Sequence, residues 1–81
     1  MDTTKVEELS NRIGPMLAGL DDAIQSAVIA DLLSCWIVGH HPNSRAEVFR
    51  LHMSLVQKLI PINEQRMFGP AGHPGWTQRA Q

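Results

Sequence analysis

Apolar residues along the first twenty positions recur with the period of an amphipathic helix. The members of this stripe, three or four residues apart, are Val6, Leu9, Ile13, Met16 and Leu20. This spacing places them on one face of a helix. Gly14 and Pro15 interrupt the stripe. Because glycine favours a helix end and proline favours a first helical turn, we expect an N-terminal helix that is broken near Gly14-Pro15.

A second helical pattern covers residues 22–38, and either Asp21 or Asp22 can cap its first amides. Its apolar face is broad, and the opposite face carries small residues with Asp31 as its only charge. A helix with almost no polar face is normally buried on most sides. The pattern therefore predicts a central helix over about 22–38.

A third helical pattern covers residues 45–60. Ser44 and Glu47 have the spacing of a capping box, in which two side chains bond to amides at a helix start. Pro61 follows the segment, and the residue before a proline is pushed out of helical geometry. We therefore expect the helix to end at about residue 60.

The short connection "GHHPN" predicts that these two helices form an antiparallel hairpin. In such a hairpin, residues whose numbers sum to about 83 face each other, so Asp31 is expected near His52. Glycines and prolines dominate the end of the chain. The sequence thus predicts an all-α, small helical bundle over 1–68, followed by a flexible or irregular C-terminal arm over 69–81.

Charge and composition narrow the classes of partner. Seven basic residues stand against eight acidic ones, and no block of like charge occurs. Nucleic-acid binding requires clustered cations, so it is not expected. The longest apolar run, "CWIVG", is too short to cross a bilayer, and the polar N-terminus does not resemble a signal peptide. We expect a cytoplasmic protein that does not bind a membrane, with its single cysteine reduced.

The histidines and the cysteine are the candidates for metal binding or for a response to pH. The ordinary interpretation of His52 is a core or interface histidine, and the alternative is a buried polar pair with Asp31 that responds to pH. Cys35, His40 and His41 are weak candidates for zinc ligands, because their spacing matches no established zinc pattern. No catalytic motif is present, so we expect neither an enzyme nor a cofactor.

Broad apolar faces suggest a small protein-protein interaction module that forms a homodimer through helices two and three. An alternative is a monomeric inhibitor or adaptor, of phage or mobile-element type, that blocks a larger protein. A weaker alternative is a metal- or pH-responsive regulator that acts through histidines. Trp76 either folds back onto the bundle or anchors a partner. The residues expected to mediate self-association or partner binding are Trp36, Phe49, Leu51, His52, Leu55, Leu59 and Trp76.

Overall fold

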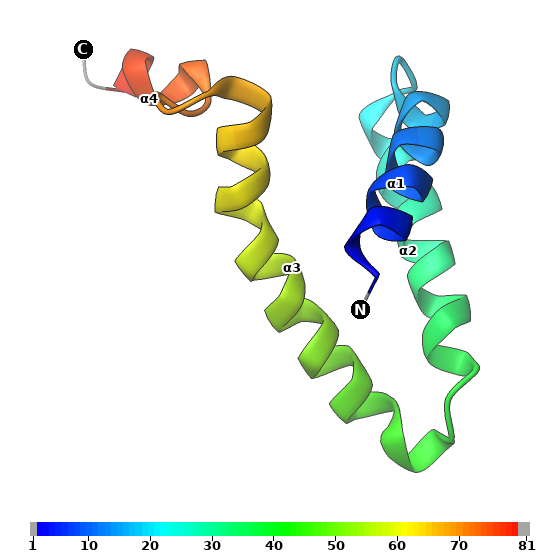
Figure 1. Cartoon of the computed structure of the whole chain (residues 1–81). Helices are drawn as coiled ribbons and strands as arrows, with labels where there is room; N and C mark the ends of the chain where they lie inside the picture. The colour runs from blue at the N-terminus through cyan, green and yellow to red at the C-terminus, as the bar shows by residue number, and fades with distance from the viewer. Residues whose placement is uncertain (1, 80–81) are drawn as a thin grey trace. The chain divides into compact units, whose positions relative to one another are not determined.

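The computed structural model describes residues 2–79, with side-chain surroundings given for residues 2–76, and this part of the chain is all-α (Figure 1). No strand occurs within it, which confirms the expectation of an all-α chain for the described residues. Two compact units, Met1–Trp36 and Ile37–Gln81, are described in turn. The elements in chain order are α1 (Thr3–Leu17), α2 (Asp22–Val38), the 3-10 turn η1 (Pro42–Ser44), α3 (Arg45–Phe68) and α4 (Pro74–Arg79).

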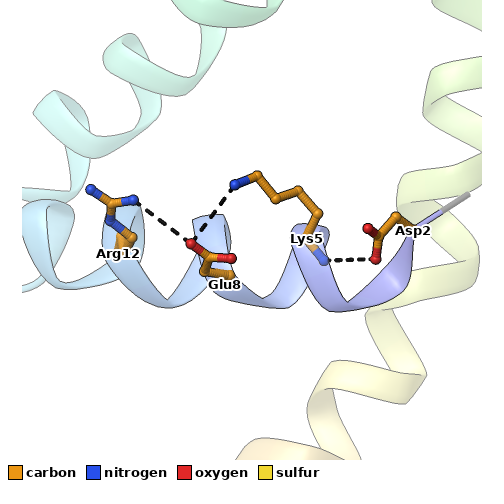
Figure 2. Close-up of polar contacts among 4 residues, drawn as sticks. All are labelled: Asp2, Lys5, Glu8 and Arg12. Carbon is orange, nitrogen blue, oxygen red and sulfur yellow. Dashed lines mark hydrogen bonds and ion pairs between the residues drawn. The ribbon is translucent and has the colours of Figure 1, made fainter.

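Helix α1 begins with a side-chain cap and carries two ion pairs on its surface. The Asp2 carboxylate accepts a hydrogen bond from the Lys5 amide at 3.1 Å, which satisfies one of the orphan donors of the first turn. Figure 2 shows Glu8 between Lys5 and Arg12, with N···O distances of 3.8 and 3.9 Å. Both ion pairs are exposed to solvent, so they contribute little to stability.

The expected break near Gly14-Pro15 is wrong. Helix α1 continues through both residues to Leu17, and the Ala18 amide still donates to the Gly14 carbonyl at 3.1 Å. Pro15 lies in the last turn, so its missing N–H removes only the bond to the carbonyl four residues earlier. The turn instead falls at Gly19, whose φ of 83° lies in the left-handed region.

Helix α2 has the bounds that the sequence predicts, from Asp22 to Val38. The Asp21 carboxylate accepts from the Ala23 amide at 3.3 Å, as a residue that caps a helix start does. Gln25 also donates from Nε2 to the Leu17 carbonyl at 2.7 Å, which ties α2 to the end of α1.

The first unit by itself does not bury α2, and cover of α2 by α3 of the second unit stays a prediction. Trp36 is 50% exposed, and no residue of α2 is buried. The apolar composition of a helix indicates that its surface needs a cover, but it does not say whether that cover belongs to the same chain.

An arginine side chain closes the end of α2. Arg45 donates from Nη2 to the Val38 carbonyl at 2.9 Å and from Nε to the His40 carbonyl at 3.3 Å. The Val38 carbonyl belongs to the group that a helix end leaves without intrahelical partners, and His40 lies in the turn that follows. A cation at this position also favours the negative end of the helix dipole.

The expected capping box at the start of α3 is not formed. Ser44 makes no side-chain cap, and Glu47 instead forms a two-pronged bond with Arg50, at 2.6 and 2.9 Å. The 3-10 turn η1 precedes α3 directly, so Ser44 itself has helical backbone angles and its side chain is not placed as a cap. The imidazole of His41 accepts from the Asn43 amide at 3.1 Å and begins this turn.

Helix α3 continues past the expected stop at Pro61 and ends at Phe68. A proline inside a helix removes one backbone bond and crowds the carbonyl four residues earlier, at a cost of about 3 kcal/mol. Eight helical residues, 61–68, nevertheless follow the predicted end. The contacts of Glu64 with the C-terminal arm, described below, are made by this added part of the helix.

The C-terminal arm contains a turn and a helix, so the expectation of an irregular arm is wrong for residues 74–79. Gly69 and Gly72 have φ values of 81° and 75°, a region that favours glycine. They reverse the chain before α4 begins at Pro74, a residue type suited to a first helical turn.

The described part of the chain has no buried core. None of residues 2–76 is buried, whether apolar or polar. Most of α2 belongs to the first unit and α3 to the second, so the antiparallel hairpin and the single domain over 1–68 stay predictions.

Candidate functional site

The described residues form a groove where the last turns of α3 meet the C-terminal arm. Its volume is about 630 Å³, which lies in the range of small-ligand sites. All of its lining belongs to the second unit. The lining residues are Val56, Leu59, Ile60, Asn63, Glu64, Met67, Phe68, His73, Gly75 and Trp76.

Glu64 holds the arm against α3 with one carboxylate oxygen. The indole Nε1 of Trp76 donates to Glu64 Oε2 at 2.5 Å, and the backbone amide of His73 donates to the same oxygen at 3.1 Å. Bonds from neutral donors to a carboxylate are stronger than bonds between neutral groups. A single acidic side chain of α3 therefore fixes both the turn and α4.

Ionisation of Glu64 is coupled to these contacts. The hydrogen bond from Trp76 lowers the pKa of the Glu64 carboxyl, the amide of His73 lowers it further, and a smaller lowering comes from the charge of the His73 imidazole. Each donor stabilises the charged form in preference to the neutral one. At neutral pH the groove thus contains a carboxylate anion.

Close backbone approaches give the turn its shape. A Cβ added at Gly72 would come within 3.2 Å of Trp76 Cδ1 and 3.3 Å of Glu64 Oε2. The His73 imidazole accepts a hydrogen bond from the Gly75 amide at 2.8 Å. The same ring contacts the Phe68 ring edge-on, with the two centroids 5.0 Å apart. The turn thus lies directly over Glu64 and beside the end of α3.

The groove combines an apolar surface with one anionic group. Apolar side chains of α3 form its floor, and the indole of Trp76 forms one wall while 54% of that residue stays exposed. An open apolar surface with a few polar groups that fix orientation is typical of a binding site. The arrangement is suited to holding a ligand.

Two of the residues predicted from sequence for partner binding, Leu59 and Trp76, line this groove. Trp76 folds back onto α3, one of the two outcomes expected for it. The other predicted residues of α3 lie outside the groove, where Phe49, Leu51 and Leu55 are exposed.

The predicted polar pair is not tested, because Asp31 belongs to the first unit and His52 to the second. His52 is half-buried on α3. The interpretation of these residues as a pH-sensitive pair stays a prediction.

The weak zinc candidates are divided between the two units, with Cys35 in the first and His40 and His41 in the second. Among the described residues, no group of three or more histidine, cysteine or acidic side chains is placed to hold a metal ion. Cys35 is exposed on α2, and the Nδ1 lone pair of His41 is engaged by the Asn43 amide.

Sequence reasoning missed Glu64, Phe68 and His73 as site residues. Glu64 lies beyond Pro61, where the helix was expected to have ended. The segment "FGPAGHPGW" does contain a signal, since two aromatic residues and a histidine are unusual in a solvated arm.

Among the described residues, none of the helices combines the length and apolar character needed to cross a membrane. Comparison with protein-family models, with curated proteins and with solved structures gives no match.

Proposed function

We propose that this chain is a small, non-enzymatic protein-protein interaction module that associates with itself through the apolar faces of α2 and α3. One observation carries the proposal: the chain is 43% hydrophobic, yet none of residues 2–76 is buried. Folding has to offset roughly 1.5 kcal/mol of conformational entropy for each ordered residue. Helices without a buried face cannot offset that cost, so a second surface must cover them.

The seam on α3 supports self-association. Leu51, Leu55 and Leu59 are spaced four residues apart, so they lie on one side of the helix, and 40–54% of each residue is exposed. The half-buried His52 borders this row, and Phe49 is exposed on another side of α3. An uninterrupted row of leucines is the kind of surface that packs against another helix.

The surface on α2 has the same character. Ile29, Leu32 and Trp36 are each at least 50% exposed, and the opposite side of the helix bears small residues. Small residues let a neighbouring helix approach closely, and large apolar residues fill the space between helices.

Two copies related by a two-fold axis would combine these surfaces into a four-helix arrangement with a shared core. In that arrangement the predicted antiparallel hairpin of α2 and α3 is one half of the bundle. Subunits of this kind often have no stable folded monomer.

Sedimentation equilibrium over a hundredfold range of chain concentration tests the proposal. We expect the mass of a dimer, with dissociation at the lowest concentrations and a parallel loss of helical circular dichroism. A concentration-independent monomer mass with full helical signal would overturn self-association. That result would favour the alternative, a monomeric inhibitor or adaptor of a larger protein.

A further inference from the structure

We propose that the groove between the end of α3 and the C-terminal arm binds a small hydrophobic ammonium ion, with Glu64 as its counter-ion. The ligand has an apolar body that lies on α3 and a cationic nitrogen at the carboxylate. The groove shares Leu59 with the row that the proposed self-association uses, whereas Leu51 and Leu55 of that row lie outside it.

Charge complementarity supports a cation. The Trp76 indole and the His73 amide, which both donate to Oε2 of Glu64, are neutral groups. The ion pairs between described residues involve other carboxylates, those of Glu8 and Glu47. Among residues 2–76, Glu64 forms no ion pair within 4.0 Å, although the charge of the His73 imidazole acts on it from farther away. An ammonium can supply a positive charge in direct contact with the carboxylate.

The aromatic wall supports the same class of ligand. Trp76 and Phe68 both line the groove beside the carboxylate. Ring faces attract cations, and tryptophan does so most strongly. A carboxylate together with aromatic rings is a combination that recognises alkylated or aromatic amines more readily than it recognises neutral molecules.

The apolar lining and the volume of the groove indicate the apolar part of the ligand. Val56, Ile60 and Met67 extend the surface along α3, away from the indole. A volume of about 630 Å³ accommodates an organic molecule of ordinary ligand size. The expected ligand is therefore an amine that carries an aryl or branched alkyl group.

The test compares 4-phenylbutylamine with 4-phenylbutan-1-ol, which has a similar shape and no charge. Binding is followed at pH 8 by nuclear magnetic resonance of the two indole N–H signals. The chain has two tryptophans, so Trp36, which lies outside the groove, serves as an internal control for the signal of Trp76. We expect the amine to shift the Trp76 signal selectively and to bind about fivefold more tightly than the alcohol.

Glu64→Gln isolates the charge, because the glutamine side chain keeps an oxygen that accepts the indole N–H. This substitution should reduce the affinity for the amine to that for the alcohol. The affinity for the alcohol should not change. Glu47→Gln is the matched control on the same helix, since Glu47 pairs with Arg50 away from the groove, and it should change neither affinity.

Ionic strength gives a second measurement on the unaltered chain, should Glu64→Gln fail to fold. Raising the salt concentration from 20 to 500 mM should weaken binding of the amine, because dissolved ions screen exposed charges. The affinity for the uncharged alcohol should stay the same. Equal affinities for the two probes, a preference that survives Glu64→Gln or high salt, or equal shifts at Trp36 and Trp76 would overturn the proposal. Absence of any shift at the solubility limit of the amine would overturn it as well.

Discussion

Leu55→Asp is the substitution that most directly tests a shared core. Leu55 lies in the middle of α3 and is 42% exposed in the chain by itself. Complete burial of a leucine contributes roughly 1.5–3 kcal/mol, so the uncovered 42% corresponds to about 0.6–1.3 kcal/mol for each copy. A symmetric dimer contains this residue twice, which doubles the loss to about 1.3–2.5 kcal/mol.

The introduced carboxylate adds a second penalty. Each aspartate would be transferred from water into the shared core without a partner, at a cost of a few kcal/mol. Together the two effects reach about 5 kcal/mol or more, which weakens dimerisation by at least roughly a thousandfold. At micromolar concentrations the substituted chain should therefore dissociate and lose its helical signal.

Sedimentation and thermal melts at several concentrations measure this effect. The melting temperature of the parent should rise with concentration, because association stabilises the folded state, whereas that of Leu55→Asp should not change. Gln57→Asp is the control, since Gln57 is exposed and lies roughly 200° around the helix from Leu55. An intact dimer in Leu55→Asp, or equal dissociation in Gln57→Asp, would refute the reasoning.

Three further predictions concern the second unit. The contacts of Glu64 lower its pKa below the ordinary value of 4.5, so the stability they give the docked arm is present above 4.5 and is lost as pH falls through the lower, docked-state pKa. In a Trp36→Phe chain, Trp76 emission should therefore shift to the red on acidification below 4.5, and a spectrum that stays unchanged until the helices themselves unfold would contradict this. Gly72→Ala should produce the same red shift at neutral pH, because the residue has a φ of 75° and an added Cβ would crowd both Trp76 and Glu64. Arg45→Met removes the bonds to the carbonyls that end α2 and should lower the free energy of unfolding by about 1 kcal/mol, with a smaller loss in Arg45→Lys, as measured by urea titration.

Local signals predicted α2 well. A capping aspartate precedes it, and a continuous apolar pattern ends at Val38, so neighbouring residues determine both of its ends. The carbonyls at that end are instead satisfied by Arg45, seven residues beyond Val38. Such a contact depends on how the chain turns between the two residues, and helical periodicity contains no information about it.

Prolines were the main source of wrong boundaries. Both Pro15 and Pro61 lie inside helices, although each predicted an interruption. A proline raises the free energy of a helix by a limited amount, and contacts made beyond it can offset that cost. For Pro61 those contacts connect Glu64 with Trp76, twelve residues apart, and only the backbone turn between them brings the pair together.

Pro61 also divides the hydrogen-bond ladder of α3 into two parts. Proline has no amide proton, so the Gln57 carbonyl receives no bond from the residue four positions later. Opening of a helix proceeds most easily from a gap of this kind. We therefore expect the amides of residues 62–79, in the last turns of α3 and the docked arm, to exchange faster than those of the leucine row before Pro61. We thus expect the C-terminal part of the molecule to open and close while Leu51 and Leu55, two residues of the proposed association surface, stay helical.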